Sequence, residues 1–392
     1  MNKSKMFKIE IPDTYYQFGR LYHLLGIWSD ADSLTWQERC RHLFYFFHFA
    51  GFMISLALGS FTTADKDESV FLAAVAIVCI VMVYRQRYIL WQNRDILVSI
   101  EKIETSYTDD RNEFVEMSST LNFFTKVVHG YLGSALSGTI PAVFLYPFFN
   151  EKRSLLFNIA FPLDRTKSEI GFWVAYLFVA GGVMWAVLCV LYTAKIWYIM
   201  VFFSVNYKTL GNQFKRLGMN RTDKPKKKVS IAEQHRHFQE DLKVAIQNYD
   251  RINSLLEVFG TDYSRLFFLQ LLTGSISICG GIYGLAFSRH ENMIMDGYNC
   301  AFLLYSVFDI FMIMYLGNEI KLASDQLSYC LFECNWMDQL TSGKKPIIIL
   351  TERLKRSQEL TVGKLYPLNL QTFTSVARAA YSMLNIVQNF RM

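Results

Sequence analysis

The chain has 392 residues, of which 52% are hydrophobic and 16% aromatic, and its mean hydropathy is +0.17. One soluble core does not normally hold so many apolar side chains, so the composition excludes an ordinary soluble domain and predicts a polytopic membrane protein. The formal net charge of +6 leaves a surplus of basic residues, whose positions along the chain indicate its orientation.

Seven runs of the sequence are apolar and long enough to cross a membrane, since about 20 residues span a hydrocarbon core of roughly 30 Å. They occupy residues 43–61, 70–90, 127–149, 172–203, 266–287, 300–322 and 368–390. Helices satisfy their backbone hydrogen bonds internally, whereas open strands in lipid do not. The sequence therefore predicts an all-α integral membrane protein with seven transmembrane helices.

Lysine and arginine are concentrated in alternate connections. The N-terminal segment is basic, whereas the first connection, TTADKDES, has only Lys66 and the fifth, SRHENMIMDGYN, has only Arg289. The second connection is basic, with Arg85 and Arg87 among its residues, and the fourth, which contains NRTDKPKKKVS, is the most basic. Because cytosolic connections accumulate Lys and Arg, we expect a cytosolic N-terminus and an extracellular C-terminus. This topology is inverted relative to G-protein-coupled receptors, whose Asp/Glu-Arg-Tyr and Asn-Pro-x-x-Tyr motifs the sequence also lacks.

The predicted organisation alternates membrane and cytosolic parts. It comprises a cytosolic N-terminal segment (1–42), transmembrane helices one to four (43–203), a cytosolic basic loop with a helical extension (204–262), transmembrane helices five and six (263–322), a cytosolic helical anchor segment (323–364) and the last transmembrane helix (365–392). Apolar residues at helical spacing predict that the fifth span continues a long cytosolic helix and that the sixth runs on to residue 340. These amphipathic extensions either lie on lipid headgroups or form an intracellular layer that joins subunits, and we favour the layer.

Sites of enzymatic chemistry are not indicated. The sequence has no nucleophile-elbow, P-loop or zinc-protease motif, so we expect no catalytic residue, no cofactor and no metal. Cys330 and Cys334 lie one helical turn apart without a neighbouring histidine, which favours buried thiols. Asp309 lies inside the sixth span, where a carboxylate either serves an ion or ligand or pairs with another helix. Lys195, in the fourth span, is a similar candidate, although its four-carbon stem near the inner leaflet can also simply snorkel.

The last span carries a regular polar stripe. Its members are Gln371, Thr374, Arg378, Ser382, Asn385 and Asn389. Their spacing of three or four residues places them on one face of a helix. Such a face is either polar contact within one bundle or the lining of a shared aqueous path, because lipid does not solvate it. Ile386, Val387 and Phe390, beside Gln388 and Asn389, would suit a hydrophobic constriction that gates such a path.

The C-terminal stretch GKLYPLNLQTFTSVARAAYSMLNIVQ resembles the signature of insect odorant receptors. KKPIIILTERLKRSQEL and LSYCLFECNWMDQL are similar to the same family's segments before the last helix and after the sixth span. The gustatory receptor pattern, Thr-Tyr followed by five residues and Gln-Phe, fits less well. Ala380 replaces its threonine, Gln388 comes one position late, and Asn389 separates Gln388 from Phe390. The chain also lacks the long insertion of the family's co-receptor in the fourth connection, so it resembles a ligand-tuning subunit.

The resemblance implies an odorant-gated, nonselective cation channel: a heterotetramer with the shared co-receptor, in the cell membrane of a sensory neuron dendrite. A small volatile odorant and membrane lipids are its other expected partners, and nucleic acid is not expected. The last helix would line the pore. The implied pore and gate residues are Ser382, Asn385, Ile386, Asn389 and Phe390, with Asn385 and Gln388 as the alternative register.

The resemblance also implies an odorant cavity between the outer halves of spans two, three, four and six. The residues assigned to it are Phe71, Val75, Ser137, Gly138, Pro141, Phe178, Trp185, Phe302 and Tyr305. Aromatic walls with a few hydroxyls suit a small volatile, because such pockets gain mainly from apolar burial. A gustatory-type or self-sufficient homotetrameric channel and a G-protein-coupled receptor are the alternatives.

The charge bias makes a prediction about glycosylation. The N-x-Ser/Thr sequons are at Asn2 and Asn220, both on the side assigned to the cytosol. Translation in microsomes should leave both unmodified, whereas a sequon in an added C-terminal extension should acquire glycan. A glycan on either native site would show that the orientation is the reverse of the one predicted.

Overall fold

The structure is a computed structural model, and it describes residues 7–9, 12–28, 35–63, 66–92, 106–108, 110–149, 155, 157, 159–162, 168–218, 231–287, 293–337, 339, 341–363 and 365–389. Long helices dominate this part of the chain. They are α1 (Asp13–Leu24), α2 (Trp36–Thr62), α3 (Lys66–Arg87) with the π-helical turn η1 (Tyr88–Gln92), α5 (Arg111–Phe149), α6 (Glu169–Lys215), α7 (Ile231–Phe287), α8 (Met293–Phe332), α9 (Thr341–Leu354) and α10 (Leu370–Asn389). All the predicted spans coincide with helices.

Five segments among the described residues are long and apolar enough to cross a membrane. They are α2, Glu68–Trp91 of α3 and η1, α6, Glu233–Ile282 of α7 and Cys300–Phe332 of α8. The other two predicted spans coincide with α5 and α10. Large apolar side chains on the outside of α2, including Phe44, Phe47 and Leu58, are exposed as they would be if they faced lipid.

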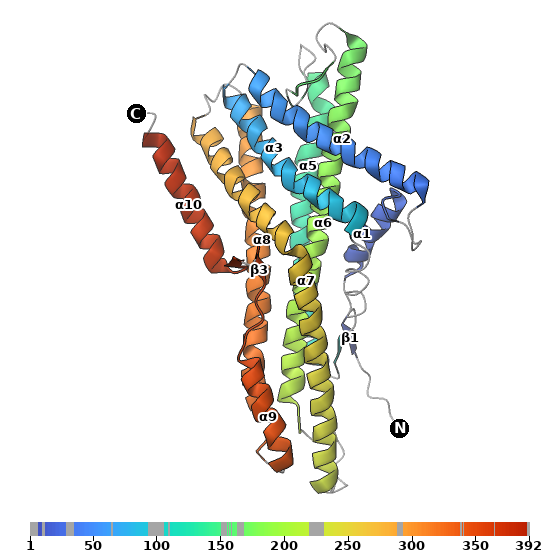
Figure 1. Cartoon of the computed structure of the whole chain (residues 1–392), viewed down its shortest axis with the longest axis vertical. Helices are drawn as coiled ribbons and strands as arrows, with labels where there is room; N and C mark the ends of the chain where they lie inside the picture. The colour runs from blue at the N-terminus through green and yellow to red at the C-terminus, as the bar shows by residue number, and fades with distance from the viewer. Residues whose placement is uncertain are drawn as a thin grey trace.

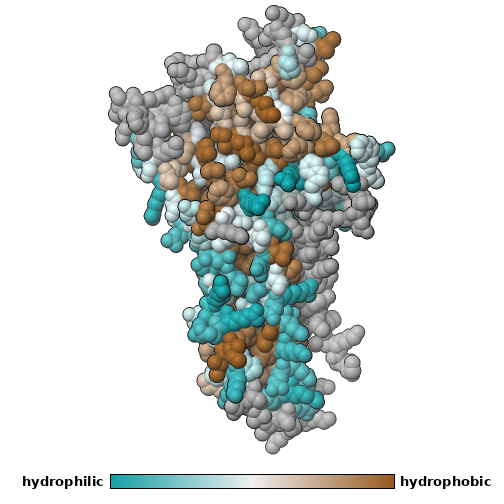
Figure 2. Space-filling view, viewed as in Figure 1, coloured by the Kyte–Doolittle hydropathy of each residue, from teal (hydrophilic) through white to brown (hydrophobic). Residues whose placement is uncertain are grey.

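The molecule is elongated, with an apolar half and a polar half. In Figure 1, α5, α6, α7 and α8 run along the long axis, α2 and α3 cross the upper part obliquely, and α9 lies at the lower end. Figure 2 shows hydrophobic side chains concentrated in the upper part and hydrophilic ones in the lower part. The two halves are those expected of a membrane bundle whose helices extend into water.

The extensions largely follow the sequence prediction. α7 is one continuous helix of 57 residues that joins the predicted cytosolic extension to the fifth span. α8, in contrast, ends at Phe332 rather than running on to residue 340. After it, the backbone N–H of Cys334 donates to Leu331, and that of Asn335 donates to the carbonyl of Leu217 at 3.2 Å. The chain leaves the helix at this point because these bonds tie it to the end of α6.

Two short antiparallel sheets of two strands each add to the predicted all-α fold. β1 (Phe7–Ile9) pairs with β2 (Ser106–Thr108), with Phe7 opposite Thr108 and Ile9 opposite Ser106. β3 (Thr361–Val362) pairs with β4 (Tyr366–Pro367), just before α10. The hairpin of β3 and β4 turns the chain from the anchor segment into the last helix.

α6 forms the centre of the bundle. It contacts α2, α3, α5, α7, α8 and α1, and it is buried along most of its length. Lys195 on this helix does not snorkel. Its side chain is buried, and its Nζ lies 4.5 Å from the ring centroid of Tyr15 and 4.2 Å from that of Trp28. Cation–π contact with these rings replaces solvent and docks the N-terminal segment against α6.

Candidate functional site

The last helix, α10, packs on its own subunit through one apolar face. Phe373 meets Phe311 of α8 edge to face at 5.4 Å, and Ala380 is buried. Val376, between them, is half-buried. Just before the helix, the carbonyl oxygen of Leu368 comes so close to Gly317 that a Cβ there would lie 2.5 Å from it. A glycine on α8 therefore lets the start of α10 contact the bundle backbone.

The polar stripe of α10 lies on the outside of the subunit. Gln371, Thr374, Arg378, Ser382 and Asn385 are all exposed. Of the predicted gate, the side chains of Ile386 and Asn389 and the whole of Phe390 lie outside the described residues. The two faces of α10 therefore differ: the helix contacts α7 and α8, the apolar face carries its buried and half-buried residues, and the polar stripe is exposed where it is described.

Several predicted pocket residues form one row of aromatic rings. The ring centroids of Phe302 on α8 and Phe71 on α3 are 6.1 Å apart, and Phe71 stacks on Phe157 with 6.5 Å between the centroids. Phe157 meets Phe52 of α2 at 6.4 Å, and Phe52 meets Phe178 of α6 at 6.2 Å. Phe157 was not predicted. It belongs to the segment before α6, which is held to α2 by hydrogen bonds between Ser55 and Ala160.

The other predicted pocket residues are divided between different neighbours. Tyr305 stacks on Tyr131 of α5 at 5.8 Å, and Val75 is half-buried on α3. Trp185 instead packs on Tyr45 of α2 at 4.9 Å, and no ring contact among the described residues joins it to Tyr305. Ser137, Gly138 and Pro141 belong to α5, but their side chains are outside the described part.

An ion pair is buried below the aromatic row. Arg85 of α3 donates from Nη2 to Oδ2 of Asp309 at 3.2 Å, and the two side chains are 1% and 10% exposed. Gln270 of α7 donates from Nε2 to the same oxygen at 2.6 Å. Three helices thus meet at one carboxylate. A buried pair of this kind persists in low-dielectric surroundings only with additional hydrogen bonds, and Gln270 supplies one.

The sequence indicated Asp309 but not its partner. Arg85 was counted among the basic residues of the second connection, although it lies within the predicted span 70–90. One signal was available: Phe71, Val75, Val78, Met82 and Arg85 follow one another at intervals of four and three residues. This spacing places the arginine on the same face of α3 as the apolar residues that pack into the bundle.

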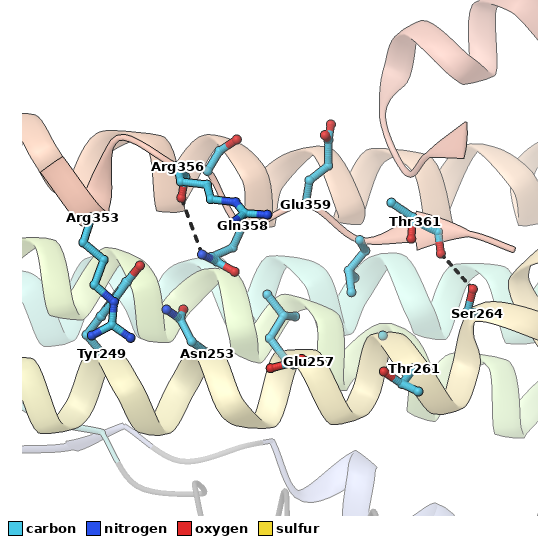
Figure 3. A pocket seen from close by; sticks show the side chains of 14 residues that line it. Tyr249, Asn253, Glu257, Thr261, Ser264, Arg353, Arg356, Gln358, Glu359 and Thr361 are labelled. Atoms are coloured by element: carbon cyan, nitrogen blue, oxygen red, sulfur yellow. Dashed lines mark hydrogen bonds between the residues drawn. The ribbon is translucent and has the colours of Figure 1, made fainter. Parts of the chain in front are cut away.

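A polar cleft lies outside the bundle and has a volume of about 720 Å³. In Figure 3 it lies between α7 and the segment that follows α9, with Tyr249 and Arg353 at one end and Ser264 and Thr361 at the other. Arg353 forms an ion pair with Asp250, with 2.8 Å between Nη1 and Oδ1, and the Ser264 hydroxyl donates to the carbonyl of Thr361 at 3.2 Å. These bonds fasten the anchor segment to α7.

Cys334, beyond the sixth span, is buried as predicted. Burial raises the pKa of the Cys334 thiol to about 11, so the group is protonated at neutral pH. A protonated thiol binds metal weakly, because the thiolate is the ligand.

Comparison with known proteins identifies the family of this chain. Residues 69–381 match the family described as 7tm Odorant receptor. The chain belongs to this odorant receptor family. Odorant receptor 59a of Drosophila melanogaster is 24% identical over 256 residues, which are 62% of each chain. Odorant receptor 23a of the same species is 29% identical over 149 residues. The chain thus spans 62% of the first relative and 39% of the second.

The fold agrees with that of a solved odorant receptor. The insect olfactory receptor OR5 from Machilis hrabei, in complex with eugenol, superposes with a TM-score of 0.76 at 13% identity, covering 97% of this chain and 100% of that one. The protein without eugenol matches with a TM-score of 0.74. The present chain is accordingly a multi-pass membrane protein with the odorant receptor fold.

The buried ion pair yields a prediction about stability. Asp309→Asn leaves Arg85 buried without a counter-charge and should destabilise the protein by about 3–5 kcal/mol, whereas the double variant Arg85→Met, Asp309→Leu should recover much of this. Thermal unfolding of detergent-purified protein, followed by size-exclusion fluorescence, measures the difference.

Lys208→Met is the matched control for this experiment. This variant breaks the half-exposed ion pair with Glu319, in which Nζ and Oε2 are 3.3 Å apart. It should lower the free energy of unfolding by at most about 1 kcal/mol. Equal losses for Asp309→Asn and Lys208→Met would contradict the importance of the buried pair.

Proposed function

We propose that this chain is the odorant-tuning subunit of a ligand-gated cation channel, assembled as a heterotetramer with the shared odorant co-receptor. The observation that carries the proposal is the exposed polar face of α10. A single subunit in lipid would place Gln371, Thr374, Arg378, Ser382 and Asn385 against hydrocarbon. Polar groups at that depth pair with other helices or line water, so the face calls for other subunits around a shared path.

In this proposal α10 lines the pore, with Ser382, Asn385, Ile386, Asn389 and Phe390 toward its extracellular end. Ile386 offers no hydrogen-bonding group, so a ring of such residues keeps the closed path dry. Asn385 and Asn389 solvate ions when the path opens. Signal transfer from the ligand to this helix runs through α7 and α8, on which α10 packs.

We place the odorant inside the subunit, along the row formed by Phe71, Phe302 and their neighbours, with Tyr305 below it. Phe71, Val75 and Phe302 are only half-buried, so part of their surface is open to a small molecule. The OR5 structure contains eugenol, a small aromatic ligand of that protein. A wall of rings gains binding energy chiefly by apolar burial, which suits a volatile.

The cytosolic layer joins the subunits in this proposal. On α9 the side chains of Ile347 and Leu350 are buried within the chain, but Ile348 and Ile349 are 62% and 71% exposed. Tyr329 and Phe332, at the end of α8, are exposed as well. Apolar side chains on a part of the molecule that lies in water are best covered by a neighbouring subunit.

Recording currents tests the proposal directly. Expressed with the co-receptor in oocytes, this chain should give inward cation currents to a subset of volatiles. Expressed alone, it should give none, because a tuning subunit does not complete the pore. Current from the chain alone would favour a homotetrameric channel, and odorant signalling without current would favour a G-protein-coupled receptor. Staining of surface protein in both conditions controls for trafficking.

A further inference from the structure

A small cavity lies directly below the aromatic row, between α3, α7 and α8. Its volume is about 10 Å³, which is the space for one water-sized group. Val78 and Met82 form its apolar part. Arg85, Gln270 and Asp309 form its polar part, together with Tyr305.

Two buried ionic side chains line the cavity, and each has a polar atom that takes no part in the ion pair. The ion pair and the bond from Gln270 use Nη2 of Arg85 and Oδ2 of Asp309. Nε of Arg85, Oδ1 of Asp309 and the hydroxyl of Tyr305 are buried and have no hydrogen-bond partner among the described residues. A donor and an acceptor therefore remain in the same small space. Leaving such groups unpaired is costly, because each has lost its water on burial.

A hydroxyl on a small ligand satisfies both atoms at once. Its oxygen accepts from the Arg85 Nε–H, and its proton is donated to Oδ1 of Asp309. A carbonyl or ether oxygen accepts but does not donate, and a hydrocarbon does neither. The pair itself is neutral overall, so nothing favours a charged ligand.

The position of the cavity connects it to the proposed odorant site. On α3, the residues Phe71 and Val75 share one face of the helix with Val78, Met82 and Arg85. On α8, Phe302, Tyr305 and Asp309 are likewise separated by three and four residues, so they share a face. A molecule whose carbon body rests on Phe71 and Phe302 points one end toward Arg85 and Asp309.

We infer that Arg85 and Asp309 form a hydroxyl-recognition subsite, which makes small volatile alcohols the preferred ligand class of this receptor. The inference rests on the proposed function, since it assumes that the odorant lies against Phe71 and Phe302. It goes beyond that function because it predicts a rank order among volatiles with the same carbon skeleton. Alcohols should be more potent than ketones or ethers, and these more potent than hydrocarbons.

The first part of the test uses the wild-type chain expressed with the co-receptor. A broad screen identifies the carbon skeleton that gives the largest current. The alcohol, ketone, methyl ether and hydrocarbon of that skeleton are then compared by their half-maximal concentrations. We expect the alcohol to be at least about tenfold more potent than the hydrocarbon, because hydrogen bonds to charged groups are worth more than neutral ones.

The second part uses Arg85→Lys, which keeps a cation beside Asp309 but removes the Nε–H. The half-maximal concentrations of the alcohol and the ketone should both rise toward that of the hydrocarbon, which should not change. Tyr192→Phe is the matched control. It removes a buried hydrogen bond of 3.0 Å to Tyr263, between α6 and α7, and should preserve the rank order.

Two results would overturn the subsite while leaving the receptor function intact. One is equal potency across the wild-type series, as expected if only water occupies the cavity. The other is an equal shift of all four compounds in Arg85→Lys, which would indicate a general effect on packing or gating. A third result contradicts the proposed function itself: no volatile evokes current, although a direct co-receptor agonist does.

Discussion

The constraint that organises this molecule is the cost of leaving a polar group unpaired in lipid. Its clearest consequence is the meeting of Arg85, Gln270 and Asp309 at one carboxylate. The three residues come from α3, α7 and α8, which are far apart in the sequence. Neither charge is stable alone at that depth, so each fixes the position of the other helix. The contact thereby sets the register of the two helices that also carry α10.

The same constraint explains why α10 has two unlike faces. Phe373, Val376 and Ala380 pack on the bundle, and Gly317 allows the chain before the helix to approach the backbone of α8. The opposite polar face is exposed on the outside of the subunit. A helix attached to its own bundle by one face, with a polar face left for other subunits, can move with α7 and α8 and alter a shared pore. In the proposed mechanism, α10 is therefore the element through which the bundle acts on the pore.

The sequence predicted the parts of the fold that depend on local pattern. Hydropathy located the spans, and the spacing of apolar residues gave the continuous α7. The polar stripe of α10 followed from its period of three to four residues. Long-range pairing was less accessible. Asp309 was recognised as unusual, but its partner Arg85 was assigned to a connection, because a basic residue near the end of a span usually indicates cytosol. The aromatic cage of Lys195 and the role of Phe157 depend on contacts between distant segments. The early end of α8 depends on a backbone bond to Leu217 that no local pattern encodes.

The central claim is that the polar face of α10 lines water in the assembled channel. It is tested by placing single cysteines on both faces and applying a water-soluble thiol reagent to open channels formed with the co-receptor. Cysteines at Gln371, Thr374, Ser382 and Asn385 should react and change the current, whereas those at Phe373, Val376 and Ala380 should not. Modification confined to the second group, or no modification anywhere on the helix, would contradict the account and place the pore elsewhere.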